Sequence, residues 1–389
     1  MECTPSQARE LIMKTYLHFI ERQLEPPTFI LIGPPGIGKS ESVMELGREL
    51  AEKLNKEFIV YDDKLFDKIM SEPDRYFVYI DIRLSLHDPG ELTGIPREAG
   101  RNAIMFKPLT WGLVLSEAAG ILFLDELTNV QREDLLAAAY RVLWDRYLGY
   151  VKLSRNVLVI AAGNRREDSS IVRKLPAPLI NRTCILYIKV PTVEEWRQYM
   201  EEKYGDRWCR TIYYYLKSRP EHLYVPPDDV ETLENFPTPR SWTKLALLLG
   251  NNPLSRYSKE EIELICIGTI GKKLGPIIAQ YIIHNVPTID DLLTNPEKWL
   301  ELPLDVKLDM LQDVARRIEE ALRSNKNDEW KRLTRLLKYV FNDSEEIGLT
   351  LLQIVPEDVK VRFIKKLSTS LPEVKRLLDK LEEKMSELE

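Results

Sequence analysis

The sequence has few residues of the kinds that build disulfide scaffolds, metal centres or membrane spans. Its 389 residues include only four cysteines and four histidines. No two cysteines form a CxxC pair, and none stands at metal-ligand spacing from a histidine, so neither a disulfide framework nor a zinc site is expected. Scattered thiols of this kind are typical of reduced side chains in an intracellular protein: Cys3, Cys184, Cys209 and Cys266. No stretch reaches the roughly 18 apolar residues of a membrane span. The first residues also lack an apolar secretion signal, which predicts a cytoplasmic protein.

Basic residues are not in excess. The chain has 55 basic and 61 acidic residues, a net charge of −6, 44% hydrophobic residues and 30% charged residues. A protein that wraps nucleic acid is usually basic, so nucleic acid is the less favoured partner, although a local basic channel in a larger assembly stays open. The composition is that of a globular protein. Because a single hydrophobic core stops growing near roughly 250–300 residues, we expect at least two domains.

Apolar runs and helical patterns divide the chain into parts of different character. The runs predict buried strands at 28–32, 76–82, 120–124, 156–162 and 182–190. Strands that are apolar throughout and separated by helical patterns indicate a mostly parallel sheet covered on both faces. After residue 191 helical periodicity dominates, with helices expected at 193–204, 208–218, 239–250, 259–283, 306–323, 328–341, 357–367 and 372–388. We therefore predict an α/β domain at 1–190, a helical lid at 191–300 and a helical extension at 301–389.

A complete phosphate-binding loop follows the first of these strands. The loop fits G-x-x-x-x-G-K-[ST] and leads into a predicted helix: Gly33, Pro34, Pro35, Gly36, Ile37, Gly38, Lys39 and Ser40. Glycines let backbone N–H groups converge on phosphate oxygens, and the helix N-terminus adds its positive dipole end. We expect Lys39 to reach the β- and γ-phosphates and the Ser40 hydroxyl to ligate Mg²⁺.

Polar side chains follow two further strands where each strand ends. Asp125 and Glu126 come directly after the apolar run 121–124, and Asn164 follows the run 156–162 through a glycine. Ligands of open α/β sheets bind at the carboxyl edge of the strands. We therefore expect Asp125 to hold Mg²⁺, Glu126 to polarise the attacking water, and Asn164 to point at the γ-phosphate. The alternative interpretations are a loop cap for the acidic pair and a simple turn for the asparagine.

The motif set as a whole resembles the MoxR-like branch of the AAA+ ATPases, especially its stand-alone members in phage, prophage and archaeal contexts. The matching stretches run in family order over residues 29–242 and include LIGPPGIGKS, ILFLDELTNV, VIAAGNRREDSSIVRKLPAPLINR and FPTPRSW. The resemblance implies an AAA+ P-loop NTPase core with a helical lid, ATP and Mg²⁺ as cofactors, and a homo-oligomeric ring, expected to be a hexamer.

The resemblance also implies roles for individual residues. Asn164 takes the sensor 1 position, and Arg240 of TPRSW takes the sensor 2 position, with a surface helix arginine as the alternative. Arg182 of LINR takes the place of the arginine finger that reaches a neighbouring subunit's ATP site. The alternative is an Arg182 that pairs with an acid at a domain edge. The rival fingers are Arg165, Arg166 and Arg173.

Two segments resemble the hairpin insertions with which such rings contact their clients. They are residues 94–108, with a turn at 99–102, and residues 147–155, with a turn near Gly149. Met105 and Phe106 are candidates for gripping a client, but apolar packing within the hairpin is the favoured interpretation. His87 is expected to be structural rather than a catalytic base. The chain has no D-x-S-x-S motif, so a von Willebrand-type A domain partner would be a separate protein.

Together these features predict a Mg-ATP-dependent ring ATPase with MoxR-like chaperone activity that remodels or assembles a client protein or complex. The alternative function is a nucleic-acid-dependent AAA+ motor or loader. A third hypothesis, a scaffold that binds ATP without appreciable hydrolysis, is disfavoured by the intact Glu126 and Asn164.

Overall fold

The protein forms two compact units in a computed structural model that describes residues 2–100, 104–165, 175–227, 234–324 and 327–371. The first unit comprises residues 1–196, 226–233 and 238–240, and the second comprises 197–225, 234–237 and 241–389. The predicted three-part division at residues 190 and 300 stays a prediction. In the described part of the chain, no helix combines the length and apolar character needed to cross a membrane.

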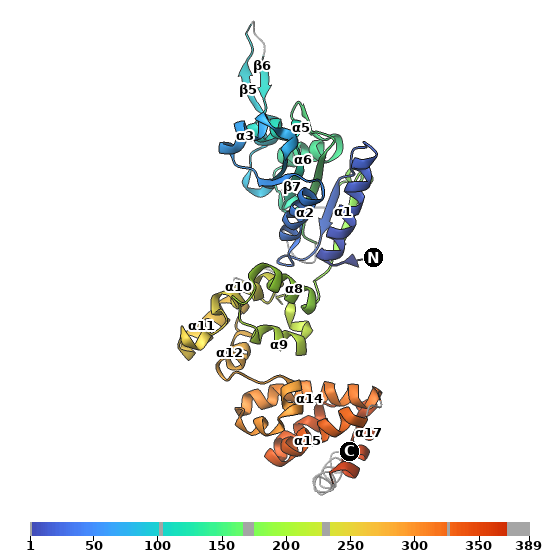
Figure 1. Ribbon diagram of the computed structural model, residues 1–389, viewed down its shortest axis with the longest axis vertical. Helices are drawn as coiled ribbons and strands as arrows, with labels where there is room; N and C mark the ends of the chain where they lie inside the picture. Colours follow the sequence, from blue (N-terminus) through green and yellow to red (C-terminus); the bar gives the residue numbers. More distant parts are fainter. Residues whose placement is uncertain (1, 101–103, 166–174, 228–233, 325–326, 372–389) are drawn as a thin grey trace. The chain divides into compact units, whose positions relative to one another are not determined.

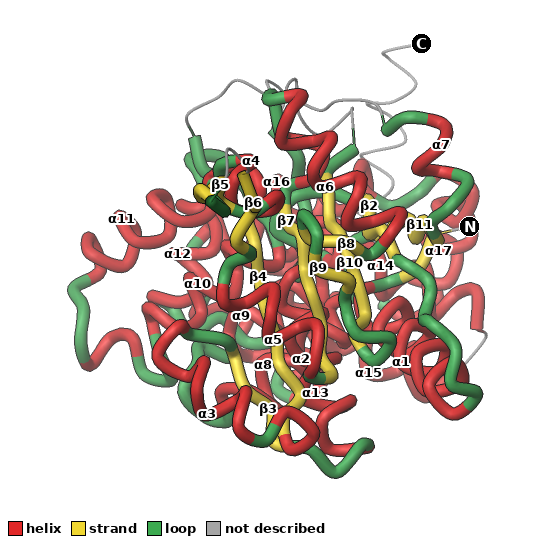
Figure 2. Tube along the Cα trace, turned by 90° about the horizontal axis from the view of Figure 1, so that it is seen from above, coloured by secondary structure: helices red, strands yellow, loops and turns green. Residues whose placement is uncertain are grey.

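A seven-stranded parallel sheet forms the centre of the first unit. Its spatial order is β1-β11-β2-β10-β7-β4-β3. Figure 2 shows β4, β7, β10 and β2 side by side. The strands are β1 (Glu2–Cys3), β2 (Phe29–Ile32), β3 (Glu57–Val60), β4 (Tyr76–Arg83), β7 (Ala119–Asp125), β10 (Val157–Gly163) and β11 (Cys184–Ile188). All five predicted strands are present, whereas β1 and β3 were not expected.

Helices cover both faces of this sheet, as the uniformly apolar strands predict. One face packs against α1 (Pro5–Glu21) and α2 (Lys39–Lys53): the ring of Tyr16 on α1 meets that of Phe77 on β4 edge to face at 6.3 Å. The other face forms one buried cluster with α3 (Phe66–Ser71), α5 (Thr110–Glu117) and α6 (Glu133–Asp145). The predicted AAA+-type P-loop NTPase fold, an α/β core followed by helices, is confirmed by this strand order and by the helical second unit.

Two antiparallel hairpins accompany the sheet, and both were expected. The strands of the first are β5 (Ile95–Glu98) and β6 (Ile104–Lys107), which project from the body of the unit in Figure 1. Residues 101 and 102 of its predicted turn lie outside the described residues. Met105 and Phe106 are 50% and 39% exposed, so neither side chain is buried in a hairpin core. The second hairpin pairs β8 (Tyr147–Leu148) with β9 (Val151–Lys152), and its Tyr150 ring lies 5.6 Å from that of Phe106.

Every described regular element of the second unit is helical. The helices of the region after residue 191 are α8 (Val193–Tyr204), which begins in the first unit, α9 (Thr211–Ser218), α10 (Pro239–Leu249), α11 (Lys259–Ile270), α12 (Gly275–Ile283), α13 (Ile289–Thr294), α14 (Leu304–Ser324), α15 (Asn327–Asp343), α16 (Glu345–Ile354) and α17 (Glu357–Ser370). The prediction of a single helix at 259–283 is wrong, because the helix is interrupted at Gly271. Its φ of 93° favours glycine, and a Cβ there would overlap the Asn235 carbonyl oxygen. The helix predicted at 372–388 lies outside the described residues.

A fully buried arginine joins α9 to α14 within the second unit. Arg219 has no exposed surface, and its guanidinium carbon lies 5.1 and 5.3 Å from the ring centroids of Tyr215 and Tyr281, which contact each other edge to face. It forms ion pairs with Asp309 at 2.8 Å and with Asp313 at 3.0 Å. Burial raises the pKa of the Asp313 carboxyl, although the Arg219 charge opposes that rise.

Candidate active site

The phosphate-binding loop is held tightly between its neighbouring strands. The Gly33 N–H donates to the Gly163 carbonyl at 3.2 Å, and a Cβ on Gly33 would overlap the carbonyl oxygen of Ile188. Gly36 and Gly38 have φ values of 75° and 93°, which L side chains rarely adopt. The glycines therefore serve both the close approach of β11 and the curvature of the loop.

Lys39 lies under this loop and is only 9% exposed. Its ammonium group donates to the carbonyl oxygens of Gly33 at 2.7 Å and Pro34 at 2.8 Å, and to Oδ1 of Asn164 at 3.3 Å. All three acceptors are neutral. Because hydrogen bonds between charged groups are stronger, phosphate oxygens would compete favourably for the same protons.

Ser40 and Asp125 meet at the carboxyl edge of the sheet. The Ser40 hydroxyl, in the first turn of α2, donates to Oδ2 of Asp125 at 2.7 Å. The other oxygen, Oδ1, accepts the Glu126 N–H at 2.8 Å. A hydroxyl and a carboxylate are oxygen ligands that suit Mg²⁺, which usually keeps several waters and binds substrate phosphates as well. No group of three or more His, Cys, Asp or Glu side chains that could hold a metal ion occurs in the described ranges.

Glu126 has an unusual backbone conformation beside this pair. Its φ of 60° and ψ of 28° are left-handed, a conformation that is uncommon for a residue other than glycine. Its carboxylate accepts a hydrogen bond from the Ser85 hydroxyl. Sequence reasoning missed Ser85. It could have been predicted from its position, because its hydroxyl comes just after the apolar strand β4, which ends at the same edge of the sheet as β7.

A second residue that sequence reasoning missed, the acidic Asp81, lies on β4. In the register of β4 and β7, Asp81 lies opposite Phe123, and Arg83 lies opposite Asp125. Partial burial, with a contribution from the Asp125 carboxylate, raises the pKa of Asp81 to about 6. The Asp125 carboxylate thus adds to the effect of burial on Asp81, while the positive charges of Arg83 and His87 oppose the rise in its pKa.

Asn164 is held beside Lys39 by a contact with the turn that follows β7. Its backbone N–H donates to the Thr128 hydroxyl at 2.8 Å, while its Oδ1 accepts from Lys39. The preceding Gly163 leaves room for this contact, since a Cβ there would lie 2.6 Å from Cγ2 of Thr128. The structure therefore brings Lys39, Ser40, Asp125, Glu126 and Asn164 together, as the motif spacing indicates.

Arg240 reaches the phosphate loop through its backbone. Its N–H, in the first turn of α10, donates to the Gly36 carbonyl at 3.0 Å, and its side chain is exposed. The neighbouring Thr238 is buried against the loop, where a Cβ on Gly36 would lie 2.8 Å from its hydroxyl oxygen.

Arg182 has no described contact with the residues around Lys39. It follows α7 (Ala177–Ile180), is exposed, and its guanidinium carbon lies 5.3 Å from the centroid of the Trp144 ring. Among the rival fingers, Arg165 pairs with Glu2 at 3.3 Å, whereas Arg166 and Arg173 lie outside the described residues. The role of Arg182 stays a prediction.

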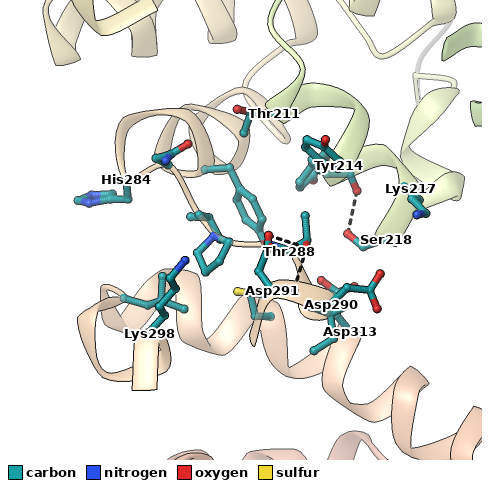
Figure 3. A pocket seen from close by; sticks show the side chains of 18 of the residues that line it. Thr211, Tyr214, Lys217, Ser218, His284, Thr288, Asp290, Asp291, Lys298 and Asp313 are labelled. Atoms are coloured by element: carbon teal, nitrogen blue, oxygen red, sulfur yellow. Dashed lines mark hydrogen bonds between the residues drawn. The ribbon is translucent and has the colours of Figure 1, made fainter. Parts of the chain in front are cut away.

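The second unit contains a large cavity of about 950 Å³, whose lining Figure 3 shows. Several of its charged lining residues have partners within the unit. Arg317 pairs with Asp290, Arg316 donates to the Ser218 carbonyl, and Asp313 pairs with Arg219. The residues of the candidate nucleotide site lie in the other unit.

Comparison with known proteins gives distant likenesses only. No protein-family model matches the sequence, and no curated protein is similar to it. The RuvB Holliday junction branch migration motor of Thermotoga maritima is 13% identical, with a TM-score of 0.33 and coverage of 76% of this chain and 75% of that one. A chain of the E. coli MS115-1 HORMA:CdnC:Trip13 complex is 14% identical, with a TM-score of 0.35 and coverage of 72% and 88%. Likenesses this distant transfer no function, and the fold follows from the chain's own strand order and phosphate loop.

Proposed function

We propose that this chain is a Mg-ATP-dependent P-loop ATPase that works as a homo-oligomeric ring and remodels a client protein or complex. The observation that carries the proposal is the convergence of Lys39, the Ser40–Asp125 pair and Glu126 at one edge of a parallel sheet. A phosphate loop alone would support nucleotide binding. A carboxylate beside it, next to a metal-ligand pair, adds the group needed to activate water.

Each residue of the site has a distinct role in this proposal. The backbone N–H groups of the loop and the Lys39 ammonium would bind the phosphates, and Ser40 and Asp125 would hold Mg²⁺. The bound metal would neutralise charge on the phosphate oxygens. Glu126 would orient the attacking water and accept its proton, while the Asn164 amide would fix the water or the γ-phosphate. Arg240 would add positive charge from the first turn of α10.

The oligomeric part of the proposal concerns Arg182 and the hairpins. Arg182 is exposed and lacks contact with its own loop, which suits a side chain that serves a neighbouring subunit's site. The exposed Met105, Phe106 and Tyr150 suit contact with a client. MoxR-like chaperone activity, a hexameric ring and a separate von Willebrand-type A domain partner are the finer forms of this proposal.

Two substitutions test the catalytic assignment directly. Glu126→Gln should retain ATP binding and lose turnover by about 10²–10⁴-fold, because a positioned base contributes that much. Lys39→Ala should lose binding itself. Glu52→Gln and Lys53→Ala, exposed changes at the far end of α2 from Ser40, are the matched controls and should behave as wild type. Equal phosphate release by wild type and Glu126→Gln would refute the mechanism.

Subunit mixing tests the ring. Arg182→Ala and Glu126→Gln subunits should each be inactive alone. Mixed, they should regain activity, because an intact Glu126 in one subunit can meet an intact Arg182 from its neighbour. No recovery at any mixing ratio would contradict a finger that acts between subunits. Stimulation of turnover by single-stranded DNA, with steep salt dependence, would instead favour the nucleic-acid motor.

A further inference from the structure

The guanidinium of Arg182 rests on an aromatic surface instead of a carboxylate. Its central carbon lies 5.3 Å from the centroid of the Trp144 ring, and Trp144 in turn stacks on Tyr140 with centroids 5.8 Å apart and planes 22° apart. Both aromatic residues belong to α6. Within the described ranges, no ion pair joins Arg182 to an acidic side chain.

The backbone of Arg182 is fixed as well as its side chain. Its N–H donates to the Leu179 carbonyl at 3.1 Å, which closes the turn after α7. Leu179 is fully buried in the cluster that covers one face of the sheet. The turn therefore sets where the side chain starts, and Trp144 sets the direction in which it extends.

The choice of tryptophan at this position is not explained by packing alone. The indole Nε1 of Trp144 is buried and has no hydrogen-bond partner in the part of the chain that the structure describes. A phenylalanine would supply a smaller apolar ring without an unpaired N–H. What the indole offers over that ring is the strongest cation–π surface of the natural side chains.

We propose that Trp144 is a positioning residue for Arg182, holding the guanidinium extended and unneutralised for the phosphates of a neighbouring subunit. The inference rests on the proposed function, in which Arg182 acts between subunits. A carboxylate partner would also orient the arginine, but it would cancel the charge and would have to be displaced at each turnover. An aromatic face orients the guanidinium plane of the arginine and leaves its full charge and its N–H groups available.

The test is kinetic and uses the full-length chain. An exposed cation–π contact contributes about 0.5–1 kcal/mol, which corresponds to a roughly 2–5-fold change in rate. Trp144→Leu should therefore lower kcat by about 2–5-fold with an unchanged KM for ATP, and Trp144→Phe should retain most of the rate. Phe58→Leu removes a similar contact, with Arg48 at 4.8 Å, and is the control that should leave kcat unchanged.

Subunit mixing separates a positioning role from a structural one. Trp144→Leu subunits mixed with Glu126→Gln subunits should regain the wild-type rate at mixed interfaces, because the finger then comes from a subunit with intact Trp144. The double variant Trp144→Leu/Arg182→Ala should be no slower than Arg182→Ala alone. If the leucine variant does not fold, Trp144→Met replaces it with the same expected loss.

The outcomes distinguish the inference from the function on which it rests. An Arg182→Ala variant that loses turnover while Trp144→Leu keeps the wild-type kcat would overturn the role of Trp144 and leave the finger intact. A slow Trp144→Leu variant that mixing cannot rescue would also overturn it, since the defect would lie in its own site. An Arg182→Ala variant with the wild-type rate would overturn both assignments.

Discussion

Replacement of Arg219 by methionine should destabilise the second unit strongly. The change keeps a long apolar side chain beside Tyr215 and Tyr281 and removes the charge, together with the N–H donors that bond the Ser218 hydroxyl and the Asp309 carbonyl. Asp309 and Asp313 would lose their ion-pair partner, and the Asp313 side chain is only 4% exposed. Breaking a buried pair by removing one partner typically costs about 3–5 kcal/mol of the free energy of unfolding. We expect that range for Arg219→Met.

A second variant separates the unpaired charge from the lost packing. Arg219→Met combined with Asp313→Leu removes the buried carboxylate as well as the guanidinium. Replacement of a buried ion pair by apolar groups of similar volume is often neutral or stabilising. The double variant should therefore recover most of the stability, although Asp309, whose side chain is 20% exposed, still loses its partner.

Hydrogen exchange of the full-length chain is the suitable assay, because a protein of two units need not unfold in one step. Peptides from α9 and α14 report the opening free energy of the elements that Arg219 joins. Peptides from β7 and β10 in the first unit provide the internal reference. If Arg219→Met changes protection of α14 by less than about 1 kcal/mol, or if the double variant is no more stable than the single one, the reasoning about buried charge is wrong.

Three further predictions concern the nucleotide site and pH. Ser85→Ala should free the Glu126 carboxylate and raise basal phosphate release about 2–5-fold at saturating ATP, an effect of the size of one weak hydrogen bond; a fall in rate would contradict this. Burial lowers the pKa of His222 in the folded protein. The unfolded chain, with a histidine pKa of about 6.5, then binds more protons, so stability should fall as pH drops below about 6.5, and His222→Gln should flatten that fall in thermal unfolding. Gly33→Ala places a methyl group against the Ile188 carbonyl and should cost about 1–3 kcal/mol together with loss of nucleotide binding, measured by thermal shift with and without ATP.

The sequence predicts the central strands well because their signal is local. Runs such as 121–124 and 156–162 are apolar throughout, and only a strand buried on both faces needs that pattern. The edge strands β1 and β3 lack it, since β1 has two residues, while β3 begins with a glutamate and has only one buried position. Their pairing depends on neighbours that are distant in the chain.

Long-range contacts explain the remaining misses. The break at Gly271 depends on the approach of the Asn235 carbonyl, which no local pattern contains. Ser85 meets Glu126 only because β4 and β7 are adjacent in the sheet. The phosphate loop motif, by contrast, combines eight consecutive residues with a strand before and a helix after, so its position was predictable from sequence alone.

The hydrogen bond between the Arg240 N–H and the Gly36 carbonyl has a mechanical consequence. Pro239 and Arg240 belong to the first unit, whereas the rest of α10 belongs to the second. Thr238 lies so close to Gly36 that no side-chain atom would fit between the loop and the residue before the helix. If the loop adjusts to phosphates as proposed, either the first turn of α10 shifts with it or the bond breaks. The helix that begins beside the phosphate loop is the same helix whose later turns belong to the second unit.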